Sequence, residues 1–393
     1  ILNTNPLIST SGLKLRGIEN QKIAGTGQLG SLELDNTAGA TLLNNISLTG
    51  NLTLTKGMLN IGSQLLSLGV QSSIISGNAF SVNNMILSDA VYGINGGVRK
   101  TVPAGAFSFV FPVGAYGKYT PVTYTALENT TSGTVLVRPV NQAHPTVNQS
   151  GSVLQYYWVI ETSALSAFKG SLTFDYQASD VNGDETSYLG ARLTGIDWAK
   201  IPGIVDAVNH RIAYPFPDAV NHLNGEYTAG IDSDIPDQVP LFISISSGAW
   251  NDKNNWQRDG GGEVPDGGPF GHRVRIETDH TIALTTNSRR VYTTTVNGRL
   301  EIGTTYGHNL GTVDGTGTIA METNQLPAGK FDGFFSCVGG TAEYGGNASY
   351  TISDRYATFK NLIITGSGTK TLPNKNIAVC NDLTVRGGTL KIS

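Results

Sequence analysis

Two stretches of the chain, one near its start and one at its end, carry the same order of apolar and glycine positions. Leu32 and Leu34 correspond to Leu362 and Ile364 at an offset of 330 residues. After one inserted residue, the offset is 331 at further positions that are apolar or glycine in both stretches: Ile46/Ile377, Leu48/Val379, Leu52/Leu383, Leu54/Val385, Gly57/Gly388, Leu59/Leu390 and Ile61/Ile392. Self-similarity of this kind is the signature of a repeated structural unit. We therefore interpret residues 12–76 and 342–393 as two copies of one module.

Each copy of the module consists of short runs in which two or three aliphatic residues alternate with polar ones, as expected for short strands. In the first copy, glycine interrupts this alternation every few residues, as at Gly50, Gly57 and Gly62. Strands this short cannot enclose a core alone, but coils of parallel strands can, because their aliphatic side chains stack from one coil to the next. The pattern favours a parallel β-helix. The alternative is a meander of antiparallel hairpins in a sandwich.

The middle of the chain carries longer runs that are richer in aromatic residues. In one of them Leu154, Tyr156, Trp158 and Ile160 share a strand face, and a second such run covers 171–176. Runs of this length between Pro and Asn/Asp turns predict an antiparallel sandwich. The 49 glycines and the 14% of charged residues also disfavour a helical bundle. We predict an all-β chain in which β-solenoid segments (1–97 and 238–393) flank a β-sandwich (98–237).

Charge and apolar content limit the partners that the chain can have. The net charge of −4 disfavours a nucleic-acid binder, and the absence of an apolar stretch of about 18 residues argues against membrane insertion. Cys337 and Cys380 can form a disulfide, but the sequence does not decide whether they do. The chain opens with Ile1 and ends inside a strand pattern, so we expect a piece of a longer protein. The likeness of its two ends suggests tandem copies or head-to-tail stacking.

One acidic loop has part of a calcium-binding pattern. Asp180, Asn182 and Asp184 place oxygen ligands at positions 1, 3 and 5 of a loop, as in an EF-hand. An EF-hand also needs Gly at position 6 and Glu at position 12, where this chain has Glu185 and Ala191. A hairpin turn explains the Asn-Gly pair equally well. These three residues are the candidate calcium ligands, and no other cofactor is expected.

Two tryptophans and a few acids are the remaining candidates for a site. Trp250 and Trp256 could form an exposed platform for a sugar, or they could cap the open end of the coil that follows. Enzymes that cleave polysaccharides need carboxylates that converge on one face. Glu277 and Asp279 share a strand face, but a polar strand end running into a turn explains them. No catalytic residue is predicted.

Four motifs of the sequence are distinctive: FVFPVG at 109–114, GKYTP at 117–121, GAWND at 248–252 with Trp256, and NLIITGSGTKTL at 361–372. They resemble motifs of large surface proteins of the Bacteroidota. The two-tryptophan motif also looks like a glycine-rich domain of some animal cell-surface proteins. The resemblance implies export by the type IX secretion route and display at the cell surface. The C-terminal sorting domain that such proteins carry is not found in this sequence.

These observations lead to one expected function and one alternative. We expect a non-enzymatic structural or adhesive segment of an extracellular surface protein, which forms a fibre or stalk by tandem or head-to-tail stacking. Its main partner would be itself, and a surface polysaccharide is a second candidate. The alternative is a carbohydrate-binding or polysaccharide-degrading β-helix protein. Exposed aromatics clustered with two or more carboxylates in one groove would favour that alternative.

Overall fold

The computed structural model describes residues 12–25, 27–88 and 96–392, and its regular secondary structure consists almost wholly of strands. The chain divides into two units, Ile1–Gln238 and Val239–Ser393. Among the described residues, no helix is long and apolar enough to cross a membrane. The helical turns there are single 3-10 turns: η1 (Ala178–Asp180), η2 (Glu185–Ser187), η3 (Asp232–Asp234) and η4 (Lys253–Asn255).

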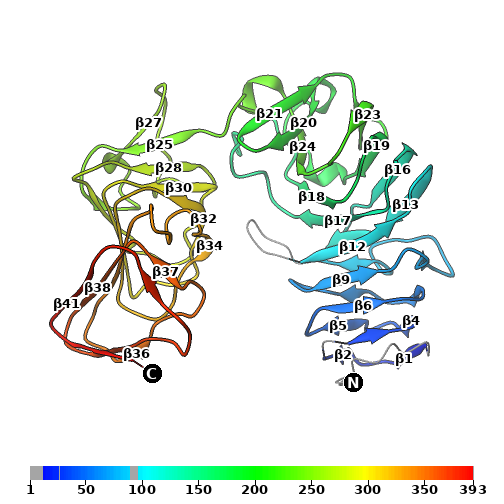
Figure 1. Ribbon diagram of the computed structural model, residues 1–393. Coiled ribbons are helices and arrows are strands. Elements are labelled where there is room, and N and C mark those ends of the chain that lie inside the picture. Colours follow the sequence, from blue (N-terminus) through cyan, green and yellow to red (C-terminus); the bar gives the residue numbers. More distant parts are fainter. Residues whose placement is uncertain (1–11, 26, 89–95, 393) are drawn as a thin grey trace. The chain divides into compact units, whose positions relative to one another are not determined.

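The first unit begins with stacked coils of parallel strands (Figure 1). Leu32 and Leu34 lie beside Leu52 and Leu54 of the next coil, so one coil takes about 20 residues. The predicted β-solenoid is therefore confirmed, and the hairpin-meander alternative is wrong for these residues. The three faces of the coils are a sheet of β1 (Leu13–Gly17), β4 (Leu32–Asn36), β7 (Leu52–Lys56) and β10 (Ile74–Ile75), a sheet of β2 (Gln21–Ile23), β5 (Ala40–Leu42), β8 (Leu59–Asn60), β11 (Ile86–Leu87), β14 (Val113–Ala115) and β15 (Lys118–Tyr119), and a sheet that opens with β3 (Gln28–Leu29), β6 (Ile46–Leu48) and β9 (Leu65–Leu68).

Alternation along each strand places aliphatic side chains inside the coil. Leu32, Leu34, Leu52 and Leu54 are all 0% exposed, and burying each contributes about 1.5–3 kcal/mol. A glycine is required at the corner of a coil, because a Cβ on Gly57 (φ +85°) would lie 1.9 Å from the carbonyl oxygen of the coil below. Gly57 is one of the positions repeated in the second copy of the module.

A single sheet continues from the coils into the middle of the chain. Its strand β12 (Gly97–Val102) pairs in parallel with β9 on one side and antiparallel with β17 (Gly133–Val140) on the other. Position 97/98, where the sequence suggested a domain boundary, thus lies inside a continuous nine-stranded sheet. The physical reason is that β12 covers the open edge of the last coil. The sheet goes on through β18 (Tyr157–Ser163), β24 (Gly225–Gly230), β20 (Leu189–Thr194) and β21 (Asp197–Ile201).

A second antiparallel sheet belongs to the same region. The faces that the sequence predicted to be buried are confirmed as core: Trp158 and Phe174 are 0% exposed and their ring centroids lie 5.0 Å apart. Leu154, Tyr156, Ile160, Leu172 and Tyr176 are buried as well. The strands of this sheet are β13 (Phe107–Phe111), β16 (Val122–Glu128), β19 (Phe168–Asp175), β23 (Arg211–Val220) and β22 (Val205–Asp206).

The second unit is again a solenoid of parallel strands, with one antiparallel pair, β25 and β27, at its start. Its sheets are β27 (Trp256–Arg258), β25 (Leu241–Ser244), β28 (Arg273–Ile276), β30 (Thr293–Val296), β32 (Asn309–Asp314) and β34 (Ala328–Lys330); β26 (Gly248–Ala249), β29 (Thr281–Ala283), β31 (Arg299–Gly303), β33 (Thr318–Met321), β35 (Thr341–Tyr344), β38 (Asn361–Thr365) and β41 (Leu383–Arg386); β36 (Tyr350–Thr351), β39 (Thr369–Thr371) and β42 (Thr389–Lys391); and β37 (Thr358–Phe359) with β40 (Ala378–Val379).

The repeat seen in the sequence is also a repeat of structure. Leu362 pairs with Leu383 between β38 and β41, just as Leu32 pairs with Leu52 between β4 and β7. The two copies of the module thus place corresponding strands in corresponding coils. Cys337 and Cys380, left open by the sequence, form a disulfide across 43 residues of the second unit.

Acidification is expected to destabilise the second unit through His308. This imidazole is 3% exposed, and burial lowers its pKa to about 4, with the nearby Arg289 charge acting in the same direction. The unfolded chain, with an ordinary histidine pKa of about 6.5, therefore binds the proton more readily than the folded one. Stability that is present above pH 6.5 should fall by roughly 2–3 kcal/mol as the pH drops to 4.

Urea unfolding of the second unit between pH 7 and pH 4 measures this effect. His308→Gln retains a donor and an acceptor near Thr305 and the Arg289 backbone, to which the imidazole is hydrogen-bonded, but it cannot titrate. The variant should lose less stability than the native chain across this range. An equal loss of stability between pH 7 and pH 4 in both proteins would show that groups other than His308 cause the acid sensitivity.

Candidate functional site

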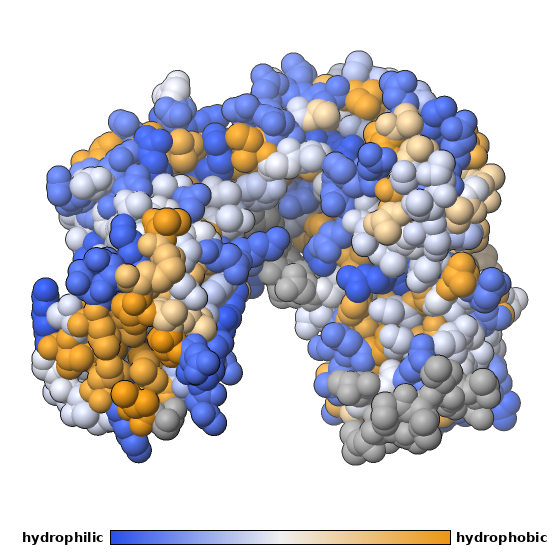
Figure 2. Space-filling model, viewed as in Figure 1, coloured by the Kyte–Doolittle hydropathy of each residue, from blue (hydrophilic) through white to orange (hydrophobic). Residues whose placement is uncertain are grey.

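The last coil of the second unit presents apolar side chains to solvent. Leu383, Val385 and Ile392 are 53%, 47% and 79% exposed, and we call these three residues the C-terminal coil face. Figure 2, drawn in the view of Figure 1, shows hydrophobic residues gathered at this end of the unit. The counterparts of these residues in the first copy of the module are Leu52, Leu54 and Ile61, all 0% exposed.

A further coil explains why the counterparts are buried. In the first unit, β10 pairs with β7, β11 pairs with β8, and β9 pairs with β6. The coil formed by β9, β10 and β11 therefore covers the row of aliphatic side chains. Among the described residues of the second unit, β41, β42 and β40 are the last strands of their sheets. Within the described residues, the C-terminal coil face therefore carries the aliphatic row that a further coil covers in the first unit. A row of this kind favours contact with another strand layer.

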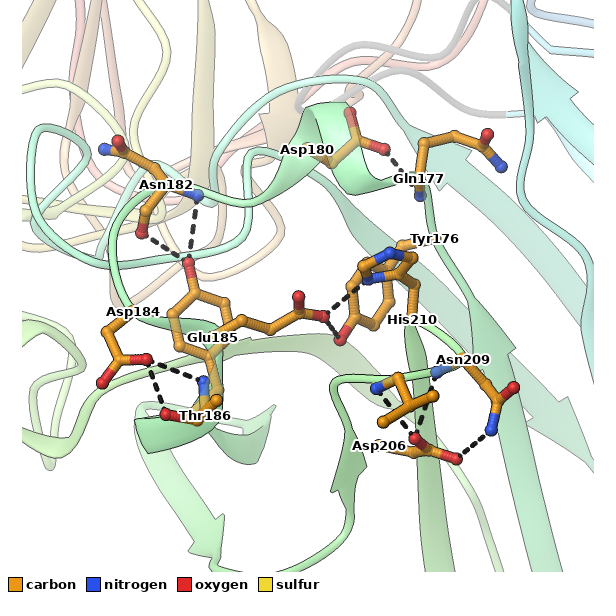
Figure 3. Close-up of polar contacts among 12 residues, drawn as sticks. Tyr176, Gln177, Asp180, Asn182, Asp184, Glu185, Thr186, Asp206, Asn209 and His210 are labelled. Atoms are coloured by element: carbon orange, nitrogen blue, oxygen red, sulfur yellow. Dashed lines mark hydrogen bonds and ion pairs between the residues drawn. The ribbon is translucent and has the colours of Figure 1, made fainter.

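The predicted calcium ligands do not converge on a common centre (Figure 3). Asp180 is fully buried and forms an ion pair with Lys118. The amide of Asn182 donates to the carbonyl oxygen of Gly151 at 2.7 Å. Asp184 caps η2, accepting hydrogen bonds from the Thr186 hydroxyl at 2.6 Å and the Ser187 hydroxyl at 2.7 Å. Among the described residues, no group of three or more His, Cys, Asp or Glu side chains is arranged to hold a metal ion.

Calcium is therefore expected to leave the thermal stability of the chain unchanged. The carboxylates of Asp180 and Asp184 already bind donors of the protein, and a cation would have to displace them. A site filled at 100 times its dissociation constant would add about 2.7 kcal/mol, which is a shift of several degrees in Tm. Thermal melts in excess calcium and in chelator measure this. A shift of several degrees that Asp184→Asn abolishes would contradict the expectation.

The two candidate tryptophans are buried rather than exposed. Trp250 is 0% and Trp256 2% exposed, and their rings meet edge to face with centroids 5.1 Å apart. Both indole N–H groups donate to backbone carbonyls, those of Pro269 at 3.0 Å and of Trp250 at 2.8 Å. Trp256 opens β27, the strand that ends its sheet beside β25. This placement fits the capping role, because buried rings offer no stacking platform for a sugar.

Carboxylates come together at a place that the sequence did not suggest. Arg299 on β31 donates to Glu301 at 2.9 Å and, with both terminal nitrogens, to Glu343 on β35 at 2.7 and 3.1 Å. This guanidinium lowers the pKa of Glu343, so the side chain remains ionised and is a poor general acid near neutral pH. Knowledge of the coil register would have revealed the cluster, since Glu301 and Glu343 occupy one column through Ala320.

The acids that the sequence did consider form ordinary surface contacts. Glu277 pairs with Arg275 at 2.6 Å, and Asp279 lies in a turn with a φ of +71°. The geometry therefore agrees with a strand end running into a turn. Comparison with known proteins returns no match for this chain among family models, curated proteins or solved structures, so the likeness to surface proteins rests on the motifs alone.

Proposed function

We propose that the chain is a non-enzymatic structural segment of an extracellular surface protein, and that it builds a fibre or stalk by stacking coils end to end. The observation that carries this proposal is the repeat of structure, because Leu362 pairs with Leu383 in the second unit as Leu32 pairs with Leu52 in the first. A contact that joins one end of a solenoid to the other end of the next does not close on itself, so it extends the assembly.

The energetics of such stacking are favourable in sign and size. Burial of Leu383, Val385 and Ile392 would contribute about 1.5–3 kcal/mol for each side chain when complete. New strand pairing along β41 and β42 would satisfy backbone groups at the open edges. These gains oppose the cost of association, which is several kcal/mol. Covalent tandem copies avoid most of that cost.

Two further observations support an extracellular structural role. The disulfide between Cys337 and Cys380 is of the kind that persists in oxidising compartments. The pKa of Glu343 is lowered chiefly by its hydrogen bonds to Arg299, so this carboxylate is poorly suited to be the general acid that polysaccharide cleavage needs. Export by the type IX route remains part of the proposal on the strength of the sequence motifs.

We also infer that the two antiparallel sheets of residues 97–230 form a β-sandwich. Side chains from both sheets meet in one aromatic cluster. Phe174 of β19 lies 5.0 Å from Trp158 of β18 and 5.0 Å from Tyr227 of β24, measured between ring centroids. Contacts of this kind between two inner faces are typical of sandwich cores.

Sedimentation over a range of concentrations tests the assembly proposal. The native chain should form species larger than 41.5 kDa, and the triple variant Leu383→Asp, Val385→Asp, Ile392→Asp should remain monomeric. Val208→Asp with Val338→Asp is a matched control, because these valines are 87% and 81% exposed but lie outside the coil face. A native chain that stays monomeric, with no larger covalent parent under denaturing conditions, would refute the proposal.

A further inference from the structure

The first unit has a groove of about 800 Å³ along the corners of its coils. Its wall is formed by Asn20 beyond β1, Ala38 beyond β4 and Met58 beyond β7, so each successive coil contributes a corner residue. Neighbouring strands in a sheet lie about 4.8 Å apart, so the groove crosses several coils as an extended channel. The loop between β10 and β11, with Asn78 and Asn83, forms another wall.

This loop holds two amide side chains available to a ligand. Asn84 is buried and fixes the loop, because its amide donates to Ser76 at 2.7 Å and its oxygen accepts from Ser81 at 3.0 Å. Asn78 and Asn83 are exposed and line the groove. Each amide offers two donors and an acceptor, which is the set of groups that recognises sugar hydroxyls. The groove thus has hydrogen-bonding groups on a loop that is already ordered.

An aromatic ring stands at the same groove. Tyr116 lies in the turn between β14 and β15 and is 79% exposed, although its ring would be stabilised by burial. Such a ring can pack against the C–H face of a sugar while neighbouring amides bind the hydroxyls. The described lining contains no Asp or Glu, and its one charged side chain, Lys56, lies 3.8 Å from Asp35. This composition suits binding of an uncharged ligand and lacks the carboxylate pair that cleavage requires.

We propose that this groove binds a neutral oligosaccharide, with Tyr116 as the stacking platform and Asn78 and Asn83 as hydroxyl ligands. The proposal goes beyond the structural role and does not depend on it, because the groove lies within the first unit and the C-terminal coil face lies within the second. It gives the segment a means of attachment to an uncharged polysaccharide.

Binding of the full chain to immobilised neutral glycans, namely β-glucan, α-mannan, xylan and starch, tests the proposal, with polygalacturonate as the acidic comparison. At least one neutral glycan should bind. Tyr116→Ala should weaken that binding about tenfold or more, while Tyr116→Phe retains most of it. Asn78→Ala with Asn83→Ala should weaken it by a similar factor.

Two controls make the result decisive. Tyr306→Ala, at a tyrosine that is 58% exposed in the second unit, should leave glycan binding unchanged. The thermal melts of all variants should match that of the native chain, because the substituted side chains are exposed. Failure to bind any of the four neutral glycans would overturn the proposal, as would binding that Tyr116→Ala leaves intact. Binding confined to polygalacturonate and lost with Lys56→Ala would also overturn it, in favour of charge recognition.

Discussion

Replacement of Trp158 by alanine is expected to lower the unfolding free energy of the first unit by about 3–5 kcal/mol. The indole is 0% exposed, and its ring lies 5.1 Å from Tyr156 and 5.0 Å from Phe174 between centroids. Its N–H donates to the backbone oxygen of Thr120 at 3.2 Å. The substitution would therefore leave a cavity at the contact of the two sheets and also an unpaired carbonyl.

Calorimetry of the full chain can measure this loss, because the two units should give separable transitions. The transition of the first unit should move by many degrees and that of the second should not move. Trp158→Phe keeps a ring but loses the N–H, so the temperature of its first transition should lie between those of the native chain and the alanine variant. Val208→Ala, at an exposed loop position, should have no effect. An unchanged first transition in Trp158→Ala would show that this tryptophan is not part of the core.

Removal of the disulfide is expected to destabilise the second unit by about 2–5 kcal/mol. The bond joins residues 43 apart, and its loss releases the loop between them in the unfolded chain. In the folded unit, it ties the segment after Phe331, Phe334 and Phe335 to the end of β40. Phe335 packs on Phe359 of β37 with centroids 5.4 Å apart, and β37 pairs with β40, so the aromatic contact and the disulfide hold this segment to neighbouring strands.

The double variant Cys337→Ser, Cys380→Ser measures the contribution of the disulfide without a leftover thiol. The temperature of its second transition should fall. Addition of reductant should lower the second transition of the native chain to the same temperature and should leave that of the variant unchanged. The first transition serves as the internal control, as the second does for Trp158→Ala. If thiol titration shows full reduction of the native chain and its second transition stays in place, the expected contribution is wrong.

The coils could be predicted because their sequence signal is local. Leu32, Leu34, Leu52 and Leu54 alternate within short strands, and glycine is required where a corner brings a backbone close, as at Gly57. The core of the middle region was predictable for the same reason, since Trp158 and its neighbours alternate along one strand.

The remaining features arise between segments that are distant in sequence. The continuity of the sheet at 97/98 depends on the free edge of β9, which local patterns do not reveal. Arg299 and Glu343 meet only because the coil register places Glu343 two strands along the column of Glu301, beside Arg299. The groove beside Tyr116 is likewise formed by corners of several coils. Burial of Trp250 and Trp256 depends on the path of the chain between β26 and β27.

The pairing of Leu32 with Leu52 and of Leu362 with Leu383 means that each coil starts where the previous one started, displaced by one strand spacing. Insertion or deletion of one complete coil keeps the same pairing between the coils on either side. Insertion or deletion of part of a coil would shift every later side chain out of register with the coil before it. Gene duplication and loss can therefore change the length of the stack in steps of about one coil without redesign of its core. The lengths of the stacks in related chains would then differ by whole coils, while corner residues other than the required glycines remain free to diverge.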